Sequence, residues 1–194
     1  MKLILLRHGK TEANEKRLYC GSTDIPLSEN GIVELTALKN SVFYPDISGF
    51  RVITSGMKRC EQTLDVLYGD IKHEILPELA EMDFGEFEMY SYEQLKDVPA
   101  YLEWISGDNE TNITPGGESG NLMKARVTAA VQKIIAAGND TLIVTHGGVI
   151  AAVMQLLFPD ENKNRYEWQP KPGRGHSVSI QCPDAPLSRC HTDV

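Results

Sequence analysis

The chain has 194 residues, of which 41% are hydrophobic and 24% are charged, and these proportions fit one globular domain with an ordinary core. A formal net charge of −8 argues against nucleic acid or an anionic membrane as a partner, so any site for anions must be local. No apolar run is long enough to span a bilayer and we see no signal-peptide pattern, so we expect a cytoplasmic protein.

Alternating strands and helices are predicted along the first half of the chain, from short apolar runs and from apolar residues at helical spacing. A strand at 2–6 leads into a polar loop at 10–27, which is too long for a passive connection and is expected to carry function. A helix then follows the N-cap Ser28, a strand lies at 51–54, and Ser55 is expected to cap the next helix. The expected buried stripes of these two helices are Ile32, Leu35, Leu38 and Val42, then Met57, Cys60, Leu64 and Leu67.

The second half of the chain continues the alternation. We expect, in chain order, a short strand near 74–76, an acidic loop at 78–89, a helix-prone stretch at 91–105 that Pro99 interrupts, a polar loop at 107–117, a helix at 119–137, a strand at 141–145, a helix at 149–158 and a strand at 176–181. This order predicts an α/β fold with three α/β/α layers and a mostly parallel central sheet. We expect one domain over residues 1–181, followed by an irregular C-terminal tail over 182–194 that contains Pro183 and Pro186.

The four cysteines do not form a recognisable metal or redox motif, because no two of them make a C-x-x-C pair. Cys190 lies beside His191, with Cys182 eight positions upstream, but this spacing is a weak basis for a metal site. Cys20 and Cys60 are far from both of these in the sequence. We therefore expect scattered free thiols in a reducing compartment, and no metal.

Polar motifs directly follow three of the predicted strands. Arg7-His8-Gly9 follows the first, Ser55 follows the second with Arg59 one helical turn later, and His146-Gly147-Gly148 follows the strand at 141–145. Each motif alone has an ordinary explanation as a buried histidine, a salt-bridged arginine or a turn. If the strands are parallel, however, all three motifs lie at one edge of the sheet, where helix N-termini and arginines suit an anionic phosphoryl group.

The same motifs resemble those of the histidine phosphatase (phosphoglycerate mutase-like) superfamily, and the resemblance covers about residues 1–181. The stretches that carry it are RHGKTEAN at 7–14, GSTDIPLS at 21–28 with Gly31, Ser55 to Arg59 with Thr63, EMDFG at 81–85, PGGES at 115–119 and THGG at 145–148. The first stretch alone is short, but the ordered set is highly specific. The resemblance implies a phosphoglycerate mutase-like fold.

The resemblance also implies roles for particular residues in covalent phosphoryl transfer. His8 would be the nucleophile, with its second ring nitrogen donating to a backbone carbonyl. Glu81 would be the general acid and then the base, although it lies in an acidic run where most carboxylates are merely solvated. The residues implied to bind the phosphoryl group are Arg7, Arg59 and His146, with Asn14, Thr23 and Gly147 beside them. No cofactor is implied.

Three positions depart from the family pattern without removing a proposed catalytic group. Gly56 stands where proline is usual after the serine, Met89 where glycine is usual, and Ala151 where arginine is common. These changes put contacts to the substrate in doubt, because the loop and the helix that carry them border the expected pocket.

The expected activity is that of a metal-independent phosphomonoesterase of the histidine acid phosphatase type, acting on a small phosphorylated metabolite. The chain most resembles the α-ribazole phosphatase branch of cobalamin biosynthesis. Two alternatives stay open, a cofactor-dependent phosphoglycerate mutase and a non-catalytic module that binds a phosphorylated ligand. The sequence also leaves open whether the chain forms a homodimer. Aromatic side chains in the variable regions offer stacking to a heteroaromatic substrate, although ordinary packing is the simpler explanation; these are Tyr90, Tyr92, Tyr101, Trp104, Tyr166 and Trp168.

Overall fold

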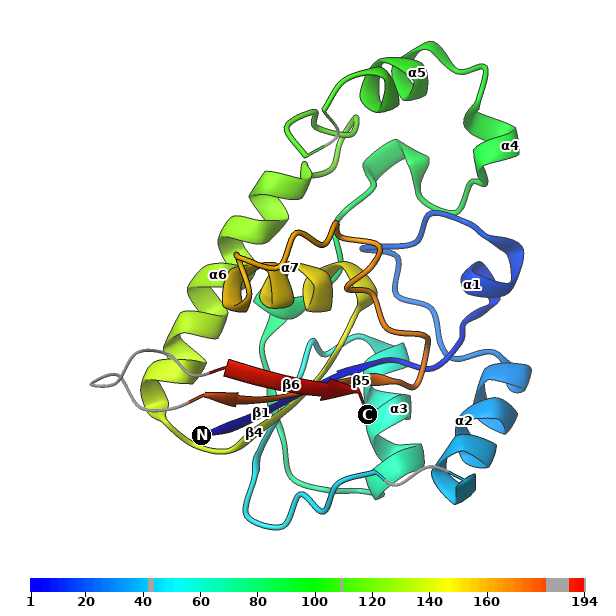
Figure 1. The fold of residues 1–194 in the computed structure, drawn as a ribbon. Coiled ribbons are helices and arrows are strands. Elements are labelled where there is room, and N and C mark those ends of the chain that lie inside the picture. The colour runs from blue at the N-terminus through cyan, green and yellow to red at the C-terminus, as the bar shows by residue number, and fades with distance from the viewer. Residues whose placement is uncertain (42–43, 109, 181–188, 194) are drawn as a thin grey trace.

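A single six-stranded sheet forms the centre of the molecule (Figure 1). The computed structural model describes residues 1–41, 44–108, 110–180 and, as backbone, 189–193. The strands are β1 (Lys2–Arg7), β2 (Arg51–Thr54), β3 (Glu74–Ile75), β4 (Thr141–Thr145), β5 (Gly175–Ile180) and β6 (Arg189–Asp193), arranged in the order β3-β2-β4-β1-β5-β6. The strands β3, β2, β4 and β1 are parallel to one another, whereas β5 pairs antiparallel with β1 and β6 pairs antiparallel with β5. The predicted α/β fold with a mostly parallel sheet is confirmed.

Helices cover both faces of this sheet. The helices are α1 (Glu12–Lys16), α2 (Glu29–Ser41), α3 (Lys58–Tyr68), α4 (Tyr92–Leu95), α5 (Pro99–Ser106), α6 (Gly120–Ala137) and α7 (Gly147–Leu157), with 3-10 turns at Pro77–Leu79 and Gly85–Phe87. Figure 1 shows α6 and α7 on one side of the sheet, and α2 and α3 on the other. Within the described residues, no helix is long and apolar enough to cross a membrane.

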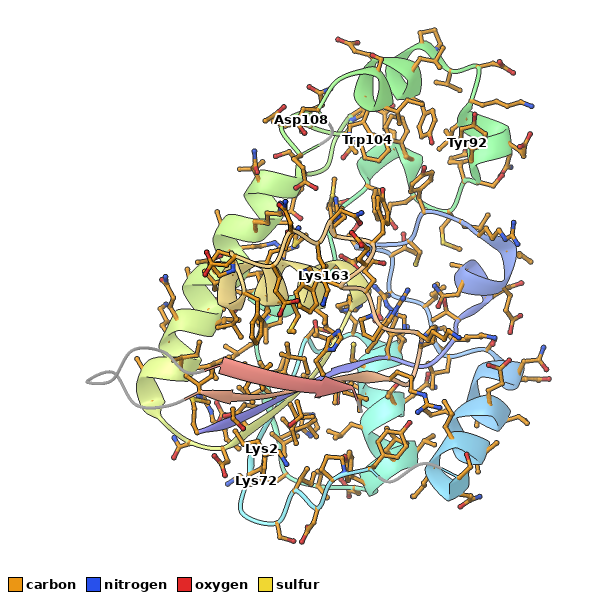
Figure 2. The ribbon with its side chains drawn as sticks, in the orientation of Figure 1. Lys2, Lys72, Tyr92, Trp104, Asp108 and Lys163 are labelled. Carbon is orange, nitrogen blue, oxygen red and sulfur yellow. The ribbon has the colours of Figure 1, made fainter. Side chains whose placement is uncertain are left out.

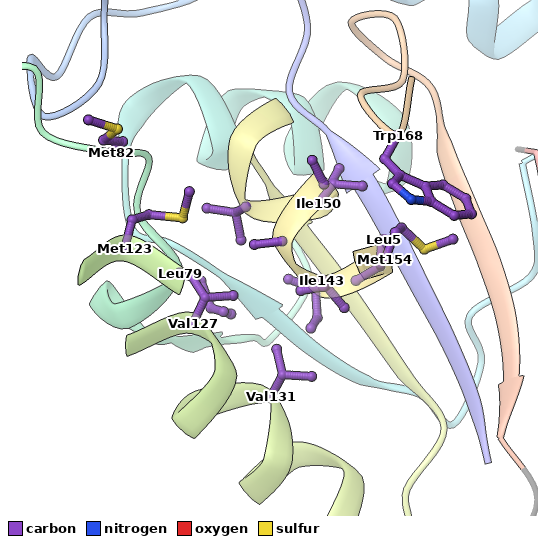
Figure 3. Close-up of a cluster of buried hydrophobic side chains, with 14 of the residues drawn as sticks. Leu5, Leu79, Met82, Met123, Val127, Val131, Ile143, Ile150, Met154 and Trp168 are labelled. Atoms are coloured by element: carbon purple, nitrogen blue, oxygen red, sulfur yellow. The ribbon is translucent and has the colours of Figure 1, made fainter. Parts of the chain in front are cut away.

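Alternation along β1 explains why two helical layers form. Successive side chains of a strand point to opposite faces, so Leu3 and Leu5 join the core under α6 and α7 while Ile4 and Leu6 join the core under α2 and α3. The helix α7 is buried on almost all sides and lies beside α6 on the same side of the sheet (Figure 3). A helix that is apolar all round requires such cover, and Trp168 provides part of it.

The parallel strands end at the same level, which places the three polar motifs together. Arg7 at the end of β1 pairs with Thr145 of β4, and Thr54 of β2 pairs with the adjacent Val144. Because β4 lies between β1 and β2, His146 lies between the motif of His8 and that of Ser55. The predicted meeting of these motifs at one sheet edge is confirmed.

Four local predictions were wrong. Ile32, which was expected in the buried stripe of the helix after Ser28, is 39% exposed. The tail is not irregular throughout, because residues 189–193 form β6, which satisfies the open edge of β5; residues 181–188, including Cys182, Pro183 and Pro186, lie outside the described residues. Ser55 does not cap α3, which begins at Lys58 after the N-cap Met57. The loop at 10–27 contains the short helix α1, which Thr11 caps.

Candidate active site

His8 lies at the end of β1 in a single defined tautomer. Its Nδ1 is 2.7 Å from the carbonyl oxygen of Gly9, and since a carbonyl can only accept, Nδ1 carries the hydrogen. This leaves the lone pair on Nε2. Burial, and then the guanidinium groups of Arg59 and Arg7, hold the pKa of His8 well below its usual value. The ring is therefore neutral at physiological pH, as a nucleophile must be.

His146, the N-cap residue of α7, is buried directly beside His8. The two ring centroids are 5.1 Å apart, with the planes inclined at 63°. Nδ1 of His146 accepts from Nε of Arg59 at 3.3 Å, so Nε2 carries the hydrogen and donates to Oγ of Ser55 at 2.9 Å. Burial, with smaller contributions from His8 and the arginines, lowers the pKa of His146 well below its usual value. In this geometry His146 braces Arg59 and packs against His8.

Arg59 and Arg7 bring two guanidinium groups to the same edge. Arg59 is 1% exposed, and its Nη2 and Nη1 donate to the carbonyls of Gly21 at 2.7 Å and Thr23 at 2.9 Å. Arg7 donates from Nη1 to the carbonyl of Pro170 at 2.8 Å, whereas its buried Nε has no hydrogen-bond partner among the described residues. Leaving a buried donor unpaired costs about 1–3 kcal/mol. An anion bound at Arg7 would remove that cost.

Arg7 and Glu81 approach the first turn of α7 closely, so an added side chain there would displace them. A Cβ at position 147 would lie 3.0 Å from Cζ of Arg7, and one at position 148 would lie 3.1 Å from Cδ of Glu81. Oε2 of Glu81 accepts from the backbone N–H of Gly148 at 2.9 Å, and Oε1 accepts from that of Met82 at 3.0 Å. Burial lowers the pKa of Arg7, and the nearby Glu81 carboxylate raises it by a smaller amount.

Glu81 lines two cavities, and the smaller of them also contains Arg7. This cavity of about 330 Å³ is lined by Arg7, Asn14, Glu81 and Gly148 on one side and by Tyr19, Phe84, Trp104 and Tyr166 on another. The larger cavity, of about 580 Å³, has charged groups on its wall, among them Asp24, Asp83, Glu118 and Arg126, together with the apolar side chains of Met57, Ile75 and Pro77. The carboxylate of Glu81 is therefore reachable from both cavities.

The remaining predicted contacts are placed less directly. Asn14 lines the smaller cavity, but its Oδ1 accepts from the backbone and hydroxyl groups of Thr11 in the cap of α1. Thr23 contributes to the site with its backbone carbonyl, which accepts a hydrogen bond from Arg59. Gly147 forms the first residue of α7 and lies against Arg7.

Several aromatic side chains form a packed cluster, part of which also lines the smaller cavity. Tyr19, Phe84, Phe87, Tyr101 and Trp104 contact one another with ring centroids 5.2–6.2 Å apart. Figure 2 shows Trp104 below α5, toward the body of the molecule. Of the six aromatics considered from the sequence, Trp104 and Tyr166 line the smaller cavity, whereas Trp168 packs against Phe158 and His176. Tyr90 and Tyr92 are exposed, and Tyr101 is buried in the cluster.

Arg126 of α6 is a site residue that the sequence reasoning missed. Its guanidinium donates to the carbonyls of Glu78, Ala80 and Glu81 at 2.7–2.9 Å and to the carboxylate of Glu118 at 2.8 Å. These bonds tie the segment that carries Glu81 to the side of α6. The only sequence signal for this role was the presence of an arginine in the helix predicted at 119–137 and of an acidic loop at 78–89, to which an arginine could bind.

Two departures from the family pattern have visible backbone consequences. Gly56 has φ of +79°, which proline cannot adopt, and this turn delays the start of α3. Met89 has φ of +64°, in the left-handed region that favours glycine. Ala151 is buried within α7. In the described part of the chain, no group of three or more histidine, cysteine, aspartate or glutamate side chains is placed to hold a metal ion.

Comparison with known proteins identifies the family. The model of the histidine phosphatase superfamily, branch 1, matches residues 3–181. The chain belongs to the histidine phosphatase superfamily. It is 31% identical over 186 residues to an adenosylcobalamin/alpha-ribazole phosphatase of Salmonella typhimurium strain LT2, with 93% of this chain and 91% of that protein covered.

Solved structures of the superfamily share this fold. The structure of an alpha-ribazole phosphatase from Shigella flexneri matches with a TM-score of 0.82 and 28% identity, over 93% of this chain and 91% of that one. A phosphoglycerate mutase from Thermus thermophilus matches with a TM-score of 0.70 and 28% identity, over 97% of this chain and 98% of that one. The phosphoglycerate mutase-like fold is confirmed, and the similarity to the phosphatases supports a phosphatase activity.

Proposed function

We propose that this chain hydrolyses a small phosphomonoester through a phosphohistidine at His8, as a phosphatase of the histidine acid phosphatase type. The observation that carries the proposal is the neutral His8 ring, whose Nδ1–H is held on Gly9 so that Nε2 keeps its lone pair. Two guanidinium groups and a carboxylate lie at the same sheet edge, and this arrangement supports charge stabilisation together with proton transfer.

In the first step, Nε2 of His8 attacks phosphorus. The N–P bond forms as the ester P–O bond breaks, and the leaving oxygen takes the proton of the Glu81 carboxyl group. Arg7 and Arg59 stabilise the charge on the phosphoryl oxygens, and the unpartnered Nε of Arg7 supplies one donor. His146 supports this step by bracing Arg59.

In the second step, water attacks the phosphohistidine. The Glu81 carboxylate takes a proton from the water as its oxygen bonds to phosphorus and the N–P bond breaks, which returns neutral His8 and releases inorganic phosphate. The water takes the position that the leaving oxygen has vacated, opposite Nε2 of His8, so one carboxylate can serve first as the acid and then as the base.

We propose α-ribazole phosphate as the best single substrate candidate. The named activity of the relatives from Salmonella and Shigella supports it, as does a cavity beside Arg7 with Trp104 and Tyr166 on its wall, which suits a planar heteroaromatic group. Phosphate release from a panel of phosphorylated metabolites, including this one, tests the assignment.

A second candidate is a bisphosphoglycerate-dependent phosphoglycerate mutase, because the chain is also 28% identical over 167 residues to such an enzyme of Beijerinckia indica. Interconversion of phosphoglycerates that depends on bisphosphoglycerate would favour the mutase, and net release of phosphate would favour the phosphatase. A non-catalytic binding module has no need of Glu81, and trapping a phosphorylated His8 would exclude it. The cytoplasmic location and a homodimer stay predictions.

Hydrolysis of an aryl phosphate in the presence of a chelator tests the proposed activity directly. Replacement of the nucleophile should cost several orders of magnitude in rate, so His8→Ala should be almost inactive while remaining folded. Full turnover by His8→Ala, or no turnover by the unmodified protein, would refute the proposal.

A further inference from the structure

Glu88 has a half-buried carboxylate that the mechanism above does not use. It follows the 3-10 turn at Gly85–Phe87, and its two oxygens accept from backbone N–H groups of two separate segments. The donors are Gly21 at 2.9 and 3.0 Å, Ser22 at 3.0 Å, Thr23 at 3.2 Å and Phe84 at 2.9 Å. In the described part of the chain, no lysine or arginine forms an ion pair with Glu88. This carboxylate therefore accepts hydrogen bonds from all three backbone N–H groups of the loop at 21–23.

The opposite side of the same loop holds Arg59. The carbonyl of Gly21 accepts from Nη2 of Arg59 at 2.7 Å, and that of Thr23 accepts from Nη1 at 2.9 Å. The single peptide group that joins Gly21 to Ser22 thus donates to the Glu88 carboxylate and accepts from the Arg59 guanidinium. Its dipole is aligned between an anion and a cation, so each of the two charge-assisted hydrogen bonds strengthens the other.

Close packing leaves this loop little freedom to move independently. A side chain at position 21 would collide with the backbone carbonyl of Met82, so only glycine fits there. The loop is held between the segment at 82–88 on one side and Arg59 on the other, and Arg59 itself reaches His146 through Nε. A chain of direct contacts therefore leads from Glu88 to the two histidines.

We propose that Glu88 is a positioning residue for Arg59, which it holds through the Gly21–Ser22 peptide in the orientation that meets the phosphoryl group. Glu88 does not touch the substrate. The inference rests on the proposed function, because Arg59 is the group through which it acts. At metal sites, mutation of a residue that holds a ligand in place typically lowers affinity or activity roughly 10- to 100-fold. We expect a loss in the same range when Glu88 is replaced.

The test compares Glu88→Gln with Glu86→Gln, because Glu86 is an exposed glutamate in the 3-10 turn that precedes Glu88. The affinity for orthovanadate, which adopts the five-coordinate geometry of the transferring phosphoryl group, is measured together with kcat and KM for an aryl phosphate. Glu88→Gln should lose roughly 10- to 100-fold in vanadate affinity and in kcat, with a smaller change in KM, whereas Glu86→Gln should match the unmodified protein. A change of less than twofold in a folded Glu88→Gln would overturn the proposal.

Coupling to Arg59 separates a positioning role from a general loss of stability. In an Arg59→Lys background, Glu88→Gln should cost little further vanadate affinity, and a full additive loss would contradict the proposal. If Glu88→Gln does not fold, Glu88→Asp, which keeps the charge at a shorter reach, carries the same two comparisons with a smaller expected loss. Vanadate binding needs no turnover, so failure of the proposed hydrolysis stays distinguishable from failure of this inference.

Discussion

Replacement of Gly148 by alanine should lower activity without lowering the stability of the fold. The added Cβ would lie 3.1 Å from Cδ of Glu81 and closer still to Oε1. Ordinary carbon–carbon contacts are about 3.5–4.0 Å, so the carboxylate must move by roughly 1 Å. A displacement of that size can cost about 100-fold in rate when proton transfer depends on alignment.

The helix should tolerate the change, because alanine is favoured over glycine in a helix by up to about 1 kcal/mol and Gly148 lies inside α7. The backbone N–H of residue 148 also stays available to the carboxylate. We therefore expect thermal unfolding at an unchanged or higher temperature. Loss of stability would show that the strain falls on the backbone rather than on the Glu81 side chain.

The assay is the burst of alcohol release in a rapid-quench experiment, which isolates formation of the phosphohistidine. An alkyl phosphate needs its leaving oxygen protonated, whereas 4-nitrophenyl phosphate releases a stable anion. Gly148→Ala should slow the burst about 100-fold with the alkyl ester and much less with the nitrophenyl ester. Equal losses with both esters, or no loss with either, would refute the assignment of Glu81 as the general acid.

Three further predictions follow from the same geometry. Because burial lowers the pKa of His8 below its unfolded value, the unfolded state binds the proton first, so stability falls as pH drops below about 6.5, with a slope of up to about 1.4 kcal/mol per pH unit. In urea unfolding, the stability of His8→Asn should fall less between pH 7 and 5 than that of the unmodified protein. An identical pH dependence of the two proteins would contradict a buried neutral ring at position 8. A lysine in Arg126→Lys cannot reproduce the hydrogen bonds to three carbonyls and to the Glu118 carboxylate. Steady-state kinetics should therefore show kcat about 10-fold lower at nearly constant KM. A change confined to KM would contradict the role of Arg126 in positioning Glu81. Tyr166→Ala removes an exposed ring from the wall of the smaller cavity, so KM should rise about 10-fold for a heteroaromatic ester and stay constant for a small alkyl phosphate, and equal KM changes would exclude stacking.

The fold was predictable where local sequence pattern and burial agree. β1, β2 and β4 are short apolar runs that end at polar residues, and their common end level follows from parallel pairing. The strand β6 was missed because its five residues, RCHTD, are mostly polar and carry none of the apolar pattern by which the other strands were predicted. The start of α3 was misplaced because the positive φ of Gly56 inserts a turn after Ser55.

The candidate site was predictable only in part. Arg7, His8, Arg59 and His146 follow strand ends, so topology alone brings them together. The two supporting residues, Glu88 and Arg126, act across gaps of 65–67 and 45–48 residues, and nothing local distinguishes them from other charged side chains. Sequence reasoning could not show that Thr23 serves through its carbonyl, because that follows from where the buried guanidinium of Arg59 lies.

Trapping the covalent intermediate tests the central claim most directly. The protein is mixed with a ³²P-labelled phosphomonoester, quenched within a single turnover under alkaline conditions that preserve phosphohistidine, and mapped by mass spectrometry. The mechanism predicts near-stoichiometric, acid-labile phosphate on His8, and none in His8→Ala. Label on another residue, or turnover with no labelled protein at any quench time, would contradict the account.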